Sequence, residues 1–155
     1  MNPSVGFRSL RIAGAGIVLR GAGASTPDNP YPENSLSSFR KAIAPGANGI
    51  ELDVELTSDG RLIVMHDDML DRTATCTGCV SAYTLAEVRE CNLLDGDGQP
   101  TIEVPPPLPE SYDAVPDDAL VNVWTVPRAA DMQSATNEGV TAIVTDESAV
   151  LVGYE

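Results

Sequence analysis

An apolar segment with acidic residues at every second position constrains the fold of this chain more than any other feature. Residues 49–54 read Gly-Ile-Glu-Leu-Asp-Val, a polar turn follows at 57–60, and residues 62–65 form a second apolar run. Side chains of a β-strand point to alternate faces, so Glu51 and Asp53 share one face and the apolar residues share the other. We therefore expect a strand that is buried on one face and presents two carboxylates on the other.

The two carboxylates and the histidine that follows them predict a metal-assisted site. Glu51 and Asp53 repel each other unless a cation lies between them, and Mg²⁺ or Ca²⁺ prefers such oxygen ligands. His66 is the single histidine of the chain and follows the second apolar run directly. It can take or give a proton near neutral pH. This combination is typical of metal-assisted hydrolysis of a phosphate ester. Glu55 lies nearer the turn, and we expect it to be solvated.

Length and charge limit the class of protein. The chain has 155 residues, which fits a single domain with a core of its own, and it carries a net charge of −14. Such an acidic chain is a poor partner for nucleic acid or an anionic membrane. We expect no transmembrane segment, because no run of about 18 apolar residues occurs. No clean signal-peptide cleavage site follows the N-terminal apolar stretch, so we expect a cytoplasmic protein.

Predicted strands alternate with predicted helices along the chain. Thr84 and Glu87 have the spacing of a capping box at the start of one helix. This alternation indicates right-handed β-α-β crossovers and a parallel sheet, whose chemistry lies at the carboxyl ends of the strands. We expect strands at 17–19, 49–54, 62–65, 121–126 and 140–144, and helices at 36–44, 84–91, 110–114 and 128–137.

Three cysteines leave several interpretations open. Cys76 and Cys79 form a C-x-x-C pair, which is typical of a redox pair or of half a zinc site. No second Cys/His pair completes a zinc site. The alternative is that the two residues, together with Cys91, are incidental cysteines of a loop.

A series of short strings, taken in order, resembles the glycerophosphodiester phosphodiesterase family. Each string alone is weakly specific, and together they cover about residues 16–148. They are Leu-Arg-Gly-Ala at 19–22, Pro-Glu-Asn-Ser-Leu at 32–36, the acidic strand at 49–54, Thr-Ser-Asp-Gly at 57–60, His-Asp-Asp at 66–68, Leu-Asp-Arg-Thr at 70–73, Thr-Leu-Ala-Glu at 84–87, Val-Trp-Thr-Val at 123–126, Gly-Val at 139–140 and Thr-Asp at 145–146.

The resemblance implies an α/β fold of the TIM-barrel type, as in phospholipase C-like phosphodiesterases. It further implies a divalent cation, Mg²⁺ or Ca²⁺, and hydrolysis of small-molecule glycerophosphodiesters to glycerol 3-phosphate and an alcohol. Glu51 and Asp53 would bind the metal. His66 would be one of two histidines that act as general acid and base.

The resemblance also assigns substrate-binding residues. Arg20 would bind the phosphate and take part in catalysis. Glu33 would line the site or orient Arg20. Trp124 would stack on a ligand at the mouth of the barrel or fill the core.

Two positions and the length depart from the family pattern. The family begins His-Arg-Gly-Ala, and here Leu19 stands at the histidine position. The Glu-x-Lys of the third family strand, which supplies a further metal ligand, is also absent. Residues 120–123 instead run into Trp124 and the seventh-strand string. A TIM barrel needs about 250 residues. We therefore expect an incomplete barrel with about four main parallel strands, its middle deleted near 120–124.

Several expectations follow from these departures. In an intact barrel the last, first and second strands are neighbours, so we expect 140–144 beside 17–19. The strand at 121–126 would lie at either edge of that set. Two open sheet edges would favour a homodimer. Metal binding would be weak and activity weak or lost, since losing a general acid or base costs about 10²–10⁴ in rate. The alternative is a non-catalytic remnant that serves as a binding or interaction module. Phospholipase D-like toxins of the same superfamily are a third reading, although they too would need an N-terminal histidine.

Overall fold

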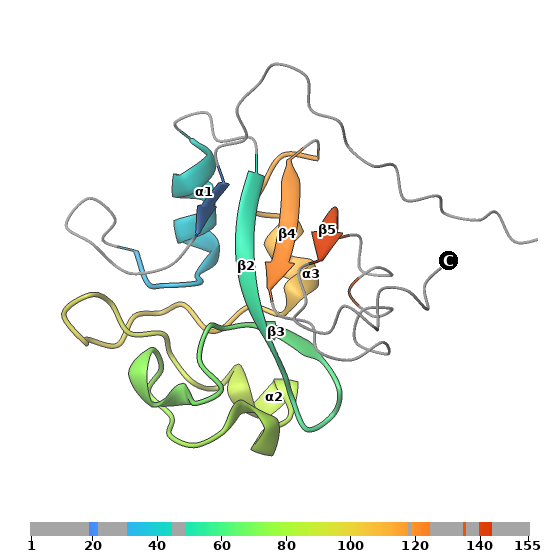
Figure 1. Ribbon diagram of the computed structural model, residues 1–155. Helices are drawn as coiled ribbons and strands as arrows, with labels where there is room; N and C mark the ends of the chain where they lie inside the picture. Colours follow the sequence, from blue (N-terminus) through green and yellow to red (C-terminus); the bar gives the residue numbers. More distant parts are fainter. Residues whose placement is uncertain are drawn as a thin grey trace, which may run out of the picture.

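Four parallel strands form the centre of the computed structural model (Figure 1). The structure describes residues 19–21, 31–44, 49–117, 119–124, 135 and 140–143. The strands are β1 (Leu19–Gly21), β2 (Gly49–Leu56), β4 (Leu120–Trp124) and β5 (Ala142–Ile143), in the order β1-β2-β4-β5. β3 (Leu62–Val64) pairs antiparallel with the far end of β2. The prediction of an incomplete barrel with about four main parallel strands is confirmed.

The expected neighbour of the last strand is wrong. β5 pairs with β4, where Asn122 lies opposite Ala142 and Val123 opposite Ile143. The backbone N–H of Thr141 also donates to the carbonyl oxygen of Val121 at 3.0 Å. Strands joined by one crossover usually lie side by side, and here that local preference prevails over the closure that would bring the last strand to β1.

The main core lies on one face of the sheet. The apolar residues of β2 and β4 alternate with polar ones and point toward α1 (Leu36–Ile43) and α3 (Leu108–Tyr112), which contact each other. Burial of this face excludes water from a continuous apolar layer, which drives the strands and helices together. The fully or nearly fully buried members include Phe39, Ile50, Leu52, Val54, Leu108, Val121, Val123 and Ala135.

The turn before α1 is fixed by its own hydrogen bonds. Ser35 is the N-cap, and its Oγ accepts from the backbone N–H of Ser38 at 3.1 Å. Asn34 has φ 56°, a left-handed conformation that Asn tolerates better than most residues. The carboxylate of Glu103 accepts from the backbone N–H of Ser37 at 3.2 Å, and so meets a free donor of the first helical turn. This turn sets the position of Glu33.

A smaller unit follows β3 and occupies the lower part of Figure 1. It contains the 3₁₀ turns η1 (Leu70–Arg72) and η2 (Val80–Ala82) and the helix α2 (Leu85–Val88). Both parts of the predicted capping box of α2 are present. β3 contributes Leu62 and Val64 to the main core and Ile63 to a second core inside this unit. The shared strand therefore fixes the small unit to the sheet.

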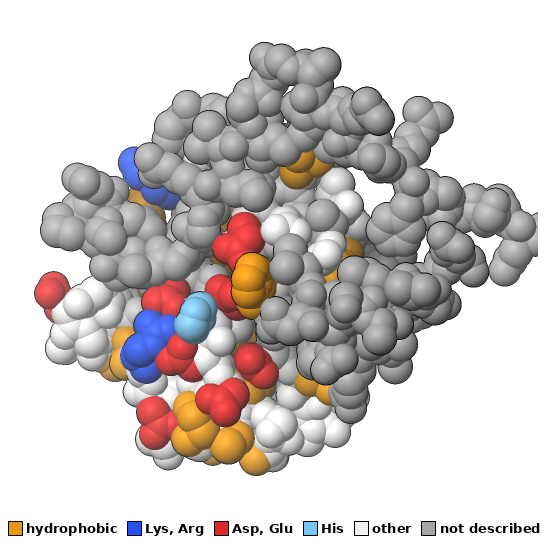
Figure 2. Space-filling model, in the orientation of Figure 1, with side chains coloured by type: hydrophobic (Ala, Val, Ile, Leu, Met, Phe, Trp, Pro, Cys, Tyr) orange, Lys and Arg blue, Asp and Glu red, His pale blue; other side chains and the backbone are white. Residues whose placement is uncertain are grey.

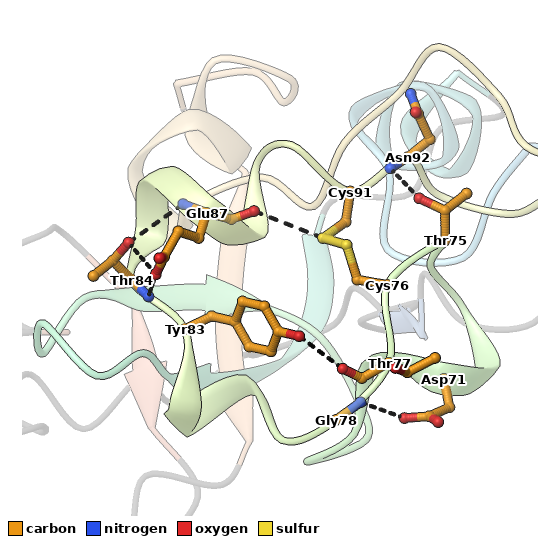
Figure 3. The surroundings of a disulfide bond; sticks show 10 residues. All are labelled: Asp71, Thr75, Cys76, Thr77, Gly78, Tyr83, Thr84, Glu87, Cys91 and Asn92. Atoms are coloured by element: carbon orange, nitrogen blue, oxygen red, sulfur yellow. Dashed lines mark hydrogen bonds between the residues drawn. A yellow bond between two sulfur atoms is a disulfide. The ribbon is translucent and has the colours of Figure 1, made fainter.

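A disulfide between Cys76 and Cys91 closes the small unit (Figure 3). Cys79 is free and exposed. The C-x-x-C is therefore no dithiol pair, and the interpretation of Cys76 and Cys91 as incidental cysteines is wrong. The fold brings together two residues 15 positions apart. The backbone of Cys79 instead pairs with that of Met69 in an isolated antiparallel β-bridge.

The predicted element boundaries are close to the observed ones where the structure describes them. The helix expected at 110–114 begins earlier, at Leu108, because Pro107 ends the extended segment and is the N-cap of α3. Apart from Ala135, the helix predicted at 128–137 lies outside the described residues, as does the string at 145–146. No helix in the described part of the chain is long and apolar enough to cross a membrane.

Candidate active site

Three carboxylates lie along the face of β2 that is turned away from the main core. Glu51, Asp53 and Glu55 alternate with buried apolar residues and are each half-buried. Burial is the largest cause that raises the pKa of each of the three, and the charge of Asp53 raises the pKa of Glu51 and Glu55 further. The expectation that Glu55 is solvated is therefore wrong, because it belongs to the same crowded acidic row.

β4 places two further side chains beside these carboxylates. In the parallel register Glu51 lies opposite Asn122 and Asp53 lies opposite Trp124. Val123, between the two, is buried in the main core, so Asn122 and Trp124 belong to the carboxylate face. Trp124 is 46% exposed, which excludes the interpretation that it fills the core. Because Trp124 lies opposite Asp53 and is exposed, a ligand bound at Asp53 could contact its ring.

Asn122 supplies a test of whether this face fits a cation. Its Oδ1 is buried and has no hydrogen-bond partner among the described residues. A buried oxygen without a donor is costly, and a hard cation that prefers oxygen ligands would satisfy it. Two carboxylates and one amide oxygen therefore fit Mg²⁺ or Ca²⁺. Within the described ranges, no group of three or more His, Cys, Asp or Glu residues is arranged to hold a metal, so two carboxylates would have to suffice.

His66 follows β3 after one residue, Met65, and its side chain lies at the surface. Its side chain is 62% exposed, and its Nδ1 lies 2.7 Å from Oδ1 of Asp67. The hydrogen bond to Asp67 is the main cause that raises the pKa of His66, and the negative charges of Asp53, Asp67 and Glu33 add to it. Asp67 has no proton to donate when it is ionised, so Nδ1 is the donor and Nε2 is left for other contacts.

Arg72 connects His66 to the segment before α1. Its Nη1 and Nη2 each donate to the carboxylate of Glu33 at 2.8 Å, and its Nε donates to Oδ2 of Asp67 at 2.5 Å. Nη2 also lies 3.1 Å from Oδ1 of Asp67. The bonds from Arg72 are the main reason that the pKa of Asp67 falls to about 2. Glu33 also raises the pKa of Asp53 by its charge, and its roles in lining the site or orienting Arg20 stay predictions.

Arg20 belongs to β1, where it pairs in register with Ile50 of β2. Its side chain lies outside the described residues, so its role in phosphate binding stays a prediction. The sequence interpretation missed three residues of this face: Asn122, Asp67 and Arg72. Asn122 alternates with buried valines in a predicted strand, which is a signal that could have been used. The role of Arg72 depends on contact with Glu33, 39 positions away, and a local sequence pattern cannot predict such a contact.

The charge distribution around His66 is strongly negative. Figure 2 shows acidic side chains gathered around the histidine on one face, with basic side chains next to them. Glu51, Asp53 and Glu55 have no ion pair among the contacts of the described residues, whereas Arg72 is already bound to Glu33 and Asp67. An anionic substrate would be repelled from such a surface unless a cation offset the carboxylates.

The fold and the acidic strand define a class of phosphodiesterase-like α/β proteins, and comparison with known proteins identifies the family. A profile of the glycerophosphoryl diester phosphodiesterase family matches residues 20–119. The chain therefore belongs to this family. A glycerophosphodiester phosphodiesterase of Caldanaerobacter subterraneus is 42% identical over 94 residues, which make up 59% of this chain and 39% of that protein.

Solved structures agree with this assignment. A glycerophosphodiester phosphodiesterase from Agrobacterium tumefaciens superimposes with a TM-score of 0.70 at 25% identity, over 88% of this chain and 60% of that one. One from Thermotoga maritima gives a TM-score of 0.67 at 26% identity, over 90% and 58%. The chain thus spans less than two thirds of the length of these relatives. The family match at residues 20–119 contains β2, β3 and the small unit.

Proposed function

We propose that this chain carries a metal-dependent phosphodiesterase site of reduced power, directed at glycerophosphodiesters. The observation that carries the proposal is the acidic row on β2, with His66 within electrostatic reach of Asp53. Membership of the family supports the substrate class, since one relative is named a glycerophosphodiester phosphodiesterase and another a probable glycerophosphodiester phosphodiesterase. The products would be glycerol 3-phosphate and an alcohol.

Glu51 and Asp53 would hold the cation, with Oδ1 of Asn122 as a neutral oxygen ligand. The raised pKa values of the two carboxyls support this, because a bound cation relieves the repulsion and desolvation that raise them. The cation, when bound, supplies positive charge that draws the phosphate in and polarises its phosphorus–oxygen bonds. Two carboxylates make a weak site, since affinity for hard cations rises with the number of charged ligands.

His66 would move the proton that hydrolysis requires. Its Nδ1 is bound by Asp67, so the outward Nε2 is the atom that can donate to the leaving alcohol or accept from the attacking group. The hydrogen bond to Asp67 and the neighbouring carboxylates raise the pKa of His66. A larger fraction of the molecules therefore has a protonated imidazole near neutral pH, which favours the role of general acid. Arg20 would bind the phosphate, and Trp124 would pack against the alcohol part of the substrate.

Leu19 limits the rate. Leucine cannot transfer a proton, and the absence of one general acid or base typically lowers the rate by about 10²–10⁴. The alternative function is a binding module that keeps the metal and phosphodiester pocket without turnover. Leu19 and the missing third carboxylate favour this alternative, whereas His66 and the acidic row favour the enzyme.

The enzymatic proposal is tested with glycerophosphocholine and purified protein in Mg²⁺ or Ca²⁺, with glycerol 3-phosphate as the measured product. We expect slow turnover that EDTA abolishes and that His66→Ala and Asp53→Ala each reduce to background. Asp97→Asn, which changes an exposed loop carboxylate, is the matched control and should leave the rate unchanged. No turnover from folded protein that still binds the cation would support the binding module instead.

We also propose that two copies associate through their sheets. Four strands form an arc, and about eight are needed for a filled barrel, so two arcs could complete one. β1 and β5 are the outermost strands of the described sheet. Light scattering coupled to size exclusion should give twice the mass of 16.3 kDa. A monomer at all concentrations would refute this association and leave the catalytic proposal untouched.

A further inference from the structure

We propose that Arg72 is a positioning residue that, through Asp67, fixes His66 in the tautomer with its hydrogen on Nδ1 and its outward Nε2 bare. This inference rests on the proposed role of His66 and extends it to a residue that contacts Asp67 and Glu33. It assigns a task to a guanidinium that belongs neither to the metal ligands nor to the phosphate-binding residues.

The geometry of Asp67 carries the first step. Both oxygens of its carboxylate are occupied: Oδ1 faces Nδ1 of His66 at 2.7 Å, and Oδ2 accepts from Nε of Arg72 at 2.5 Å. Nη2 of Arg72 lies within 3.1 Å of Oδ1, so two donors of the same planar group fix the carboxylate plane. A carboxylate fixed on two sides keeps its remaining lone pair aimed at the imidazole.

Glu33 carries the second step. An arginine on the surface would usually turn freely and contribute little. Here Nη1 and Nη2 each lie 2.8 Å from an oxygen of Glu33, whose side chain is only 11% exposed. Glu33 follows Pro32 in the turn that Ser35 and Asn34 hold in place before α1. The guanidinium is therefore anchored to the main fold, and Asp67 is anchored to the guanidinium.

The tautomer of His66 is the consequence. A neutral imidazole has one N–H hydrogen, which in free histidine lies preferentially on Nε2. An ionised Asp67 can only accept, so it selects the tautomer with the hydrogen on Nδ1 and leaves Nε2 as a base. Arg72 also keeps the pKa of Asp67 low, which holds the acceptor ionised. Without Arg72, the exposed carboxylate could rotate into water and the selection would weaken.

The chain offers an unusually clean assay, because His66 is its single histidine. The ¹⁵N chemical shifts of the ring nitrogens report the tautomer ratio directly, at a pH well above the titration midpoint of His66. We expect the tautomer with the hydrogen on Nδ1 to dominate in the wild type. In Arg72→Ala the unanchored Asp67 should lose its hydrogen bond to Nδ1 of His66, and the ratio should fall about tenfold, the effect expected for the loss of that one charge-assisted bond. Arg40→Ala, which removes an exposed arginine of α1, is the matched control and should keep the wild-type ratio.

Two further variants keep the test decisive if Arg72→Ala does not fold. Arg72→Lys retains the charge but cannot place two fixed donors on Asp67, so the ratio should fall partway. Asp67→Asn removes the charged acceptor and should lose the preference. An Arg72→Ala or Arg72→Lys protein with a dispersed spectrum and an unchanged ratio would overturn the proposal.

The measurement needs neither substrate nor metal, so it is independent of turnover. A shifted ratio in an inactive protein would uphold the role of Arg72 and count against the proposed function alone. If the protein is active, Arg72→Ala should lower kcat while KM changes little, because Arg72 is proposed to act on the imidazole through Asp67. A change in KM alone would contradict a positioning role.

Discussion

Opening the disulfide between Cys76 and Cys91 should lower the stability of the chain by a defined amount. The bond closes a loop with a sequence separation of 15. In the chain-entropy treatment a loop of this size stabilises the folded state by about 3 kcal/mol at 25 °C, because it restricts the unfolded chain. For a chain of about this length each kcal/mol shifts Tm by about 2–4 °C, so reduction should lower Tm by about 6–12 °C.

The second core sets the choice of variants. Cys91 is fully buried among Ile63, Leu70, Val80 and Val88. A serine there would bury an unpaired hydroxyl and add a cost of its own. The double variant Cys76→Ala/Cys91→Ala is therefore better than the serine pair, and reduction of the unchanged protein gives the same comparison without any substitution.

The assay is thermal unfolding followed by circular dichroism, with and without a thiol-free reductant. Cys79→Ser is the matched control, because Cys79 is exposed and outside the disulfide. It should leave Tm nearly unchanged, and a thiol titration of the unfolded oxidised protein should find one free thiol per chain. Three free thiols in freshly purified protein, or a Tm that reductant does not move, would show that the disulfide does not supply this stability.

A cytoplasmic location stays a prediction, and the same titration on freshly trapped cells tests it, since a reducing compartment would keep the pair open.

Three further predictions concern charge and capping. Asp53→Asn should raise Tm in EDTA. Burial raises the pKa of Asp53, so the ionised carboxylate destabilises the folded state as pH rises above that pKa. A thermal scan at neutral pH that shows no gain in Tm would count against this prediction. The pKa of Asp67 is lowered to about 2, so Asp67 stabilises the folded state above its unfolded pKa of about 3.9, and this stabilisation is lost as pH falls through about 2. Asp67→Asn should therefore show a shallower loss of Tm across that acid range. Equal slopes in the two proteins would contradict this prediction. Thr84→Ala removes the capping box of α2 and should cost about 1 kcal/mol in denaturant unfolding, whereas a value near zero would mean that tertiary contacts alone hold the helix.

The parts of the fold that depend on local patterns were predictable from the sequence. The alternation of residues 49–54 predicted β2, and the spacing of Thr84 and Glu87 predicted the start of α2. Both signals arise within a few residues, where side-chain direction and capping hydrogen bonds decide the structure.

The parts that depend on distant segments were not predictable. The disulfide pairs Cys76 with Cys91 in place of the nearer Cys79, because the small unit folds back on itself. The sheet order depends on which edge the last strand meets, and the sequence alone suggested the wrong edge.

The candidate site divides in the same way. The motif residues Glu51, Asp53 and His66 were predicted, and the acidic row places the first two on one face. Asn122 and Arg72 were missed, since their meaning lies in the register of β4 and in a contact with Glu33. Local pattern therefore identifies the candidate residues of the site, whereas the residues that contact and support them emerge only from tertiary contacts.

Calorimetric titration with Ca²⁺ and Mg²⁺ shows whether Glu51, Asp53 and Asn122 hold a divalent cation. We expect weak one-to-one binding by the wild type, tighter binding by Asn122→Asp, which adds a third carboxylate, and none by Glu51→Gln/Asp53→Asn. Absence of binding by the wild type, or equal binding by the double variant, would mean that these residues do not form a cation site.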